Sequence, residues 1–458
     1  MRFTELSIRD PDSFIFGKAP HPVTCGRGVV IGSGTVIPEI NFTLPPIKIK
    51  QATMPQIRDQ YTEMVNGICR RALDLKVPAL LMEFETLPPM TIEPKIGLEI
   101  TSLIAVILKN YYETYGLRNA LRLTPNDTRE HQRPPFMRRG TYWEGMQTMF
   151  QGAAEAGADL LAIESTGGKE VCDEALMMGD LRTLAFALGV LAPRDMEFLW
   201  KKMVSICRDT GIVPSGDTAC GFANTAMVLA EKNLIPRVLA AVVRVMAVPR
   251  TLTAYECGAA GPGKDCAYEG PYMKAIAGVP ISMEGRTAAC AHLSSVGNIA
   301  QAVCDCWSNE SVANVHLLSA MAPVVSMEQL AYDCRLLNTA AASGKDACLS
   351  LRNWLVDSDA GMDPQAYVLR PDVVLRISKL IVGEKDPYRR TRTAAVAALN
   401  ELREAQKLEK IRLPAREKKW LDILENQALS LPGDENVLIE EMKSSPLKDK
   451  FLSEEYGL

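Results

Sequence analysis

The sequence predicts an α/β fold, a (β/α)8 TIM barrel with a loop-rich N-terminal cap and a C-terminal helical extension. Short apolar segments alternate along the chain with segments whose apolar residues have helical spacing. Strands that are apolar on both faces and separated by helices indicate a parallel sheet with helical crossovers. Six or more such units lie within about 300 residues, which fits an eight-unit barrel better than an open sheet. A doubly wound sheet would give much the same alternation.

The predicted strands are apolar segments that end near polar or glycine-rich turns: PALLMEFE (78–85), NALRLT (119–124), ADLLAIES (158–165), GIVPSGD (211–217), TLTAYEC (251–257) and GVPISME (278–284). Helical spacing is clearest in three of the segments between or beyond them: GMQTMFQGAAEAGA (145–158), NTAMVLAEKNLIPRVLAAVVRV (224–245) and NIAQAVCDCWS (298–308). These segments place the catalytic barrel domain at residues 61–385.

The two ends of the chain differ from this middle part. Residues 1–60 are irregular and rich in proline, as in GKAPHPVTCG and TLPPIKIK, so we expect them to form a loop-rich cap over one end of the barrel. From residue 386 onward the chain is charged, and its apolar residues recur at helical spacing. Residues 386–458 are therefore predicted to form a helical extension that packs on the barrel or on a partner.

The composition is that of a globular protein of enzyme size. The chain has 458 residues, 47% hydrophobic and 23% charged, with a net charge of −4, whereas a nucleic-acid-binding protein ordinarily carries a basic surface. The N-terminus has no apolar signal segment, and no run of about eighteen apolar residues occurs. We therefore expect a cytoplasmic protein with no nucleic-acid or membrane partner.

The twelve cysteines lie scattered between Cys25 and Cys348, without the dense spacing of a disulfide framework. In a reducing compartment we expect them to be thiols, and most of them to be small buried hydrophobic residues.

One glycine-rich loop, YECGAAGPGKDCAYEG (255–270), could be a phosphate site, a metal site or a turn with buried thiols. Gly258, Gly263 and Lys264 nearly match the phosphate-binding pattern G-x-x-x-x-G-K-[ST]. Asp265 occupies the hydroxyl position of that pattern, and its carboxylate would repel a phosphate. A phosphate site is therefore not predicted here, and a metal site or a turn with buried thiols remains.

A metal site is favoured by the position of three residues along the chain. Glu164, Cys220 and Cys266 each lie just beyond the end of a predicted strand. In a parallel barrel the loops after the strands all open on one face, where such folds place their active sites. One carboxylate and two thiolates would bind zinc through three protein ligands and leave a fourth position for substrate.

Other interpretations of these residues stay open at this point. Isolated cysteines are more often buried, inert thiols than metal ligands. Rival pairs are Cys290 with His292, and Cys304 with Cys306. The second pair lies in a segment with helical spacing, where residues i and i+2 point to different faces, and a lone histidine is more often a core residue.

Neighbouring residues have less specific interpretations. Asp217 and Asp265 lie near the predicted ligands and could act as second-shell groups or proton donors, although turn formation and capping explain them nearly as well. Cys257 is expected to be the last buried residue of its strand. Lys264 is expected to be solvated.

Several segments together resemble one family. GADLLAIESTGGKEV, SGDTACGFANTAM, AYECGAAGPGKDCAYEG, SMEGRTAACAH and CDCWSNESV occur in this order, and they resemble the methanol–corrinoid protein methyltransferase family, the zinc subunit of methanol activation. The resemblance extends over most of the chain, from INFTLPP to the terminal EEYGL.

The resemblance implies a (β/α)8 barrel, a catalytic zinc ion and methyl transfer from methanol to the cobalt of a separate corrinoid protein. It assigns the zinc ligands to Glu164 in ESTGGKE, Cys220 in GDTAC and Cys266 in GPGKDC. It also implies a homodimer that carries corrinoid subunits. A Lewis acid on the methanol oxygen would stabilise the charge that develops as the C–O bond breaks.

The corrinoid is expected on a partner protein rather than on this chain. Corrinoid proteins that ligate cobalt through histidine use a D-x-H-x-x-G segment. The four histidines here, His21, His131, His292 and His316, have no aspartate two residues before them. The terminal helices and the N-terminal cap are candidate docking surfaces.

Three alternatives to methanol activation remain. A zinc methyltransferase of the same build could use a methoxylated compound as its methyl donor. A barrel could bind the corrinoid protein as a scaffold without catalysis, although the presence of all three predicted ligands argues against this. A zinc hydrolase would ordinarily use histidine ligands, and this chain has few histidines.

Overall fold

The computed structural model describes residues 2–42, 47–264, 267–285, 295–304, 316–317 and 320–458. Within these residues, seven parallel strands form one curled sheet in the order β7-β6-β5-β4-β3-β9-β8. The strands are β3 (Ile37–Phe42), β4 (Leu80–Glu85), β5 (Asn119–Thr124), β6 (Leu160–Leu161), β7 (Val213–Pro214), β8 (Ser282–Glu284) and β9 (Ile299–Cys304). An α/β fold with a parallel sheet is therefore confirmed.

The two edge strands of this sheet are linked through residues 260–263. On one side, the amides of Ala260 and Gly261 donate to the carbonyls of Pro214 and Ser215, both over 2.7 Å. On the other side, the Gly263 amide donates to the carbonyl of Pro280, and its carbonyl accepts from the Ser282 amide, both over 3.0 Å. This segment therefore lies between β7 and β8.

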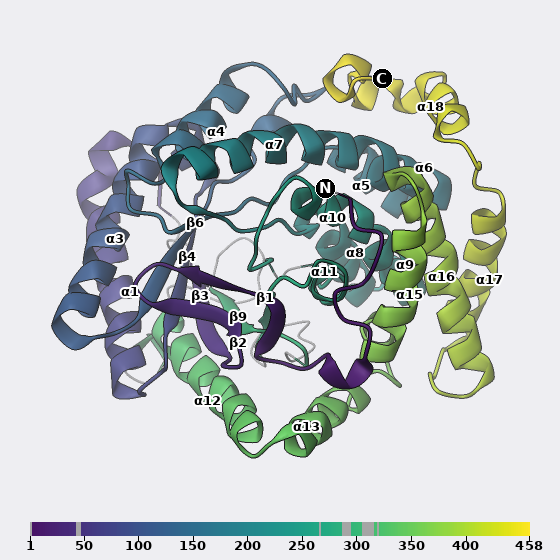
Figure 1. Cartoon of the computed structure of the whole chain (residues 1–458). Coiled ribbons are helices and arrows are strands. Elements are labelled where there is room, and N and C mark those ends of the chain that lie inside the picture. Colours follow the sequence, from purple (N-terminus) through teal and green to yellow (C-terminus); the bar gives the residue numbers. More distant parts are fainter. Residues whose placement is uncertain (1, 43–46, 265–266, 286–294, 305–315, 318–319) are drawn as a thin grey trace.

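One group of helices lies on the outer side of the sheet (Figure 1). In spatial order, one row runs α12 (Ala322–Ala342), α1 (Met54–Asp74), α3 (Pro94–Tyr115), α4 (Thr141–Gly152) and α7 (Ala192–Thr210), with each helix packed on the next. The short α2 (Pro88–Ile92) packs on α3 and α4, and α13 (Lys345–Asp357) packs on α12. The predicted helix at 145–158 is confirmed as α4.

The second group of helices lies on the other side of the molecule. Its members follow the later strands: α5 (Lys169–Met178), α6 (Leu181–Phe186), α8 (Thr225–Glu231), α9 (Arg237–Met246), α10 (Val248–Glu256), α11 (Gly270–Ala277), α14 (Pro364–Tyr367) and α15 (Pro371–Gly383). The predicted helical segment at 224–245 is confirmed as α8 and α9. The helical pattern beyond residue 386 is present as α16 (Pro387–Lys407), α17 (Ala415–Leu429) and α18 (Glu435–Lys443), of which α16 packs on α9 and α15.

Residues 1–60 were expected to be loop-rich, and this expectation is wrong for part of the segment. β3, with the sequence IPEINF, is buried over its whole length and lies between β4 and β9 in the sheet. Pro38 and the polar residues Glu39 and Asn41 made this strand hard to predict, because proline is uncommon in central strands. A fully buried strand also lacks the alternation of apolar and polar residues that marks a half-buried strand. The domain boundaries after residues 60 and 385 stay predictions.

A hairpin formed by β1 (Lys18–Cys25) and β2 (Val29–Ser33) covers the amino ends of the sheet strands. Val29 and Ile31 of β2 are fully buried and form a small core with residues from five sheet strands or their approaches: Ile37, Ala79, Leu81, Ala120, Leu160 and Ile299. The amide of Arg27, in the turn, donates to the carbonyl of Asn119 over 2.8 Å. One end of the sheet is thereby filled, so a site must open at the carboxyl ends.

Two further segments differ from the prediction. TLTAYEC (251–257) is helical, because it continues α9 into α10 after a short break and is almost wholly buried. NIAQAVCDCWS (298–308) was predicted as a helix, but β9 pairs with β3 and β8. A short apolar run does not distinguish a strand from a buried helix by its periodicity, and tertiary packing decides both cases.

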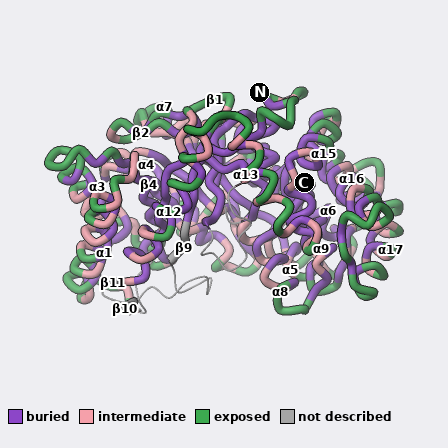
Figure 2. Tube along the Cα trace, turned by 90° about the horizontal axis from the view of Figure 1, so that it is seen from below, coloured by how far each residue is buried: buried purple, intermediate pink, exposed green. Residues whose placement is uncertain are grey.

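The helical stretch Arg237–Glu256 is long and apolar enough to cross a membrane, the single stretch of this kind among the described residues. Its apolar window lies wholly inside the protein, which is typical of a core helix. Figure 2 shows that buried residues fill the middle of the molecule and that exposed ones follow outer turns such as those of α17.

Arg122 on β5 ties together distant parts of the sheet from inside. Its guanidinium donates to Glu39 of β3 over 2.9 Å, to the Ser282 hydroxyl of β8 over 3.1 Å and to the Pro262 carbonyl over 3.3 Å. The side chains of Arg122 and Glu39 are both completely buried. The charge of each is thus compensated only inside the protein.

Replacing Arg122 by methionine should lower the free energy of unfolding by about 3–5 kcal/mol, because Glu39 would be left as an uncompensated buried charge. Thermal or denaturant unfolding measures this loss. Arg208→Met is the matched control, since the Arg208 side chain is exposed and forms an ion pair with the adjacent, exposed Asp209. Equal stability of the two variants would contradict a structural role for the Arg122 pair.

Candidate active site

Acidic side chains meet one buried cation at the carboxyl ends of the strands. The ammonium group of Lys264 contacts a carboxylate oxygen of Glu83, lies 3.2 Å from Oε1 of Glu164 and lies 3.9 Å from Oε2 of Glu85. Glu83 and Glu85 are on β4, and Glu164 follows β6. The Lys264 side chain is completely buried, whereas that of Glu164 is 17% exposed. Glu164 is therefore the member of this pair that reaches solvent.

Lys264 was expected to be solvated, and this expectation is wrong. The segment before it, residues 260–263, runs between β7 and β8, which directs the next residue inward over the strand ends. A lysine is almost never fully buried unless it is paired, and the three carboxylates supply the pairing. Lys264, in the sequence GPGKD, is therefore the counter-ion of these carboxylates.

The two glutamates of β4 have opposite pKa shifts. Burial alone would raise the pKa of Glu83, but the nearby charges of Lys264 and Arg122 hold it below its usual value. Burial, together with the charges of Glu164 and Glu83, raises the pKa of Glu85 well above its usual value despite Lys264. Burial and like charges thus shift the pKa of Glu85 upward, while the cations beside Glu83 shift the pKa of that carboxyl downward.

Further hydrogen bonds hold both β4 carboxylates in place. Gln301 of β9 donates its side-chain amide to Oε2 of Glu83 over 2.7 Å, and the Thr124 hydroxyl of β5 donates to Oε1. Asn41 of β3 donates its side-chain amide to Oε2 of Glu85 over 3.0 Å. Four strands of the sheet therefore supply side chains to this cluster.

The loop that carries Glu164 is connected to the loop that carries Cys220 through Asp217. The carboxylate of Asp217 accepts from the Ser165 amide over 3.4 Å, from Nε1 of Trp200 over 3.2 Å and from Arg250 over 3.0 Å. Burial raises the pKa of Asp217, against the opposing charge of Arg250. The structure places Asp217, a predicted second-shell group or proton donor, as a buried link between these two loops.

Cys220 is half-buried at the start of the short helix η5 (Cys220–Asn224). The side-chain amide of Asn224 lies 3.6 Å from its sulfur atom. The preceding residues are held by Glu269, whose carboxylate accepts from the Ala219 amide over 2.7 Å and from the Thr218 hydroxyl over 3.2 Å. The thiol is thus presented from a loop whose backbone is tied to a buried carboxylate.

Cys266 and Asp265 lie outside the described residues, as do Cys290, His292 and Cys306 of the rival pairs. The described residues on either side of Cys266 are placed. Lys264 is 3.2 Å from Glu164, and the Ala267 amide donates to the Thr218 hydroxyl over 3.2 Å. The chain on one side of Cys266 therefore touches Glu164, and the chain on the other side touches the residue two positions before Cys220.

The donor atoms of the three predicted ligands fit a zinc ion, which takes thiolate sulfur and carboxylate oxygen in sites of three protein ligands. Among the described residues, no group of three histidine, cysteine, aspartate or glutamate side chains is arranged to bind a metal. The predicted donors within the described residues are the Glu164 carboxylate and the Cys220 thiol, and Cys266, the third, lies outside them.

Most other described cysteines are buried free thiols, as predicted: Cys25, Cys69, Cys172, Cys207, Cys334 and Cys348. Cys257 was expected to end a buried strand, and this expectation is wrong. It follows α10 and is half-buried, because TLTAYEC forms a helix and its last residue faces the edge of the molecule.

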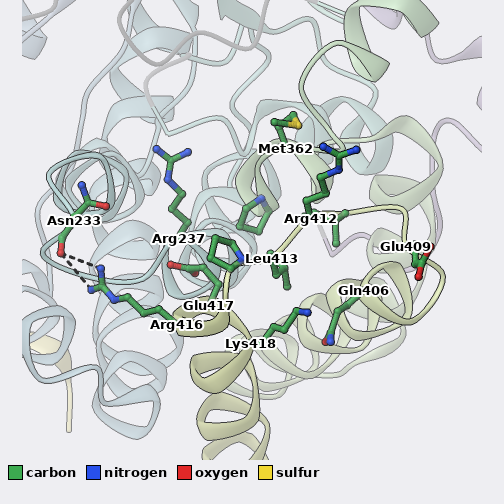
Figure 3. A pocket seen from close by; sticks show the side chains of 13 residues that line it. Asn233, Arg237, Met362, Gln406, Glu409, Arg412, Leu413, Arg416, Glu417 and Lys418 are labelled. Carbon is green, nitrogen blue, oxygen red and sulfur yellow. Dashed lines mark hydrogen bonds between the residues drawn. The ribbon is translucent and has the colours of Figure 1, made fainter.

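Figure 3 shows a cavity of about 870 Å³ that lies away from the strand ends, between the α8–α9 turn and the α16–α17 turn. Its cations are partly engaged: Arg237 pairs with Asp363 over 3.2 Å, and Arg416 donates to the Asn233 carbonyl over 3.2 Å. The charged rim and open shape do not provide the apolar enclosure typical of a small-molecule site.

Comparison with known proteins gives consistent matches over the whole chain. A family model described as "MtaB: Methanol-cobalamin methyltransferase B subunit" matches residues 1–457. The methanol–corrinoid protein co-methyltransferase of Methanosarcina barkeri (strain Fusaro / DSM 804) is 39% identical over 415 residues, which cover 89% of each chain. A chain in the crystal structure of the methanol:cobalamin methyltransferase complex MtaBC from Methanosarcina barkeri is 34% identical, with a TM-score of 0.92 over 100% of both chains.

Replacing Lys264 by methionine should lower the free energy of unfolding by about 3–5 kcal/mol, because it removes the charge that compensates buried Glu83. Thermal unfolding measures the loss. Lys201→Met is the matched control: Lys201 is exposed and pairs with exposed Glu197, and such pairs contribute about 0–1 kcal/mol. A Lys264→Met protein as stable as the control would show that Glu83 does not depend on this cation.

Proposed function

Because this chain belongs to the methanol–cobalamin methyltransferase B subunit family, we propose that Glu164, Cys220 and Cys266 hold the zinc ion with which it activates methanol. As a member of this family, the chain is a methyltransferase that transfers the methyl group of methanol to a corrinoid protein. Zinc and its ligands are the part of this account that goes beyond the family assignment.

One observation carries the ligand assignment. One described neighbour of Cys266, Lys264, contacts Glu164, and the other, Ala267, contacts Thr218, two positions before Cys220 in the sequence. The three residues are separated by more than a hundred positions between Glu164 and Cys266. Their convergence supports the interpretation that the three loops build one site at the strand ends.

A bound zinc ion would supply a Lewis acid that polarises the alcohol oxygen. The chain's own residues set the conditions for it. Lys264 lies 3.2 Å from Oε1 of Glu164, a contact that orients the carboxylate. Burial and the nearby charge of Glu164 raise the pKa of the neighbouring Glu85. Asp217 holds the Glu164 and Cys220 loops together and acts as a positioning residue, since its carboxylate is occupied by three donors.

The barrel in this proposal is closed. Residues 260–263 hydrogen-bond to both edge strands and occupy the position of the eighth barrel strand. This supports the TIM-barrel prediction. Its amino end is filled by the β1–β2 hairpin, so a corrinoid protein has to approach from the carboxyl ends, where Glu164 is partly exposed.

The corrinoid is supplied by a partner protein in this proposal. The related crystal structure is a complex named MtaBC, and its matched chain aligns with the whole of this one. A homodimer that carries corrinoid subunits and a cytoplasmic location complete the proposal. Both rest on the sequence prediction.

The proposal is tested by zinc content and by methanol-dependent methylation of a cobalt(I) corrinoid, followed by its absorbance. The purified protein should hold one zinc ion per chain. Cys266→Ala, Cys220→Ala and Glu164→Gln should each lose zinc and at least about a hundredfold of activity, because even residues that only support a ligand matter by about 10–100-fold. Cys257→Ala, which removes a half-buried thiol at the end of α10, is the matched control and should keep both.

Different results would support the alternatives. Zinc retained in Cys266→Ala, or full activity without zinc, would contradict the ligand assignment. Bound zinc with no methanol activity but with demethylation of a methoxylated compound would favour the other methyl donor. A protein that binds its corrinoid partner without zinc or turnover would be a scaffold.

A further inference from the structure

The last residues of the chain are buried against the loop that carries Glu164. Tyr456, in the short helix η7 (Ser453–Tyr456), is 1% exposed. Its hydroxyl accepts a hydrogen bond of 3.1 Å from the amide of Gly168, 288 positions earlier in the sequence. The third-to-last residue of the sequence is thereby joined to the segment that presents the predicted metal ligand.

The Glu164 loop, residues 164–168, is held by a network of buried charged side chains. Asp127 accepts from the amide and the hydroxyl of Thr166 over 2.9 and 3.0 Å. Arg129 binds Asp127 and reaches across to Asp195 over 2.8 Å. A side chain at Gly167 would clash with Asp195, so the loop lies directly on this ion-pair network.

The end of the same loop depends on Tyr456. Gly168 has a φ of +85° and immediately precedes α5. As the N-cap residue it has no side chain with which to cap that helix. The first amides of a helix have no partner within the helix, and those near its start need one from elsewhere. At Gly168 the hydroxyl of Tyr456 fills this role.

The C-terminal segment is itself firmly anchored. The carboxylate of Glu455 accepts from the Arg138 amide over 2.8 Å and pairs with Nε of Arg139 over 2.6 Å. The ring of Phe451 packs against that of Phe186, with centroids 5.1 Å apart. Lys450 pairs with Glu174 of α5 over 2.9 Å. Tyr456 therefore reaches Gly168 from a fixed support rather than from a free chain end.

We propose that Tyr456 is a positioning residue for Glu164: the C-terminal segment, residues 453–458, fixes the end of the 164–168 loop and so fixes the carboxylate at the strand ends. The proposal rests on the zinc-binding role of Glu164 proposed above. Its physical basis is that a metal ligand has to be held within about 0.5 Å of its productive position by surrounding groups. In this loop Lys264 contacts the first residue, Glu164, and Tyr456 contacts the last, Gly168.

The test is Tyr456→Phe, which keeps the buried ring and removes only the hydroxyl that accepts from Gly168. Tyr388→Phe is the matched control. Tyr388 is also buried, and its hydroxyl makes one bond, to the Pro432 carbonyl over 2.7 Å, away from the loop. Both variants lose one tyrosine hydroxyl, so their melting temperatures should fall by similar amounts.

Two measurements report on the loop. Hydrogen–deuterium exchange of the metal-free protein, followed on peptides spanning residues 164–172, should be several-fold faster in Tyr456→Phe than in the wild type and unchanged in Tyr388→Phe. Zinc transfer from the loaded protein to a chelator should be about 10-fold faster in Tyr456→Phe, the range typical of groups that orient a ligand. The kcat for methanol should fall in the same variant.

Exchange and zinc release that match those of Tyr388→Phe would overturn the proposal. Failure of the underlying zinc assignment has a different signature: Glu164→Gln would keep its zinc, while the exchange difference between the two tyrosine variants would still report on the loop.

Discussion

The compensation of buried charge by Lys264 is the constraint on which the rest of the site depends. Three carboxylates converge at the ends of β4 and β6, and one of them, Glu83, is completely buried. Ionised carboxylates are costly to bury without a partner. One ammonium group meets this need for Glu83 and at the same time orients Glu164. Burial and the charges of Glu164 and Glu83 raise the pKa of Glu85, so ionisation of this third carboxyl is disfavoured.

Lys264 can reach this position because the chain before it serves as part of the sheet. Residues 260–263 bond to both edge strands, and Arg122 ties the same segment to β3 and β8 from inside. The stability of the sheet and the geometry of the site thus depend on the same short segment. The loops that carry Glu164 and Cys220 are joined by Asp217, and the end of the chain holds the first of them through Tyr456.

The sequence predicted the parallel α/β architecture, the full length of β5, and the family. It did not predict β3, β9 or α10, because proline, inward polar residues and short apolar runs make local patterns ambiguous where burial is complete. The acidic cluster had a visible signal: Glu83 and Glu85 alternate within the apolar strand LLMEFE, so both point to the same face of the sheet. Contacts such as Lys264 with Glu83 or Tyr456 with Gly168 join residues far apart in the chain, and no local pattern indicates them.

The most direct test of the central claim, a zinc site built by Glu164, Cys220 and Cys266, is X-ray absorption spectroscopy at the zinc edge of the purified protein. The account predicts two sulfur ligands at about 2.3 Å and oxygen ligands at about 2.0–2.2 Å. A spectrum dominated by nitrogen ligands, or one without two sulfur ligands, would contradict it.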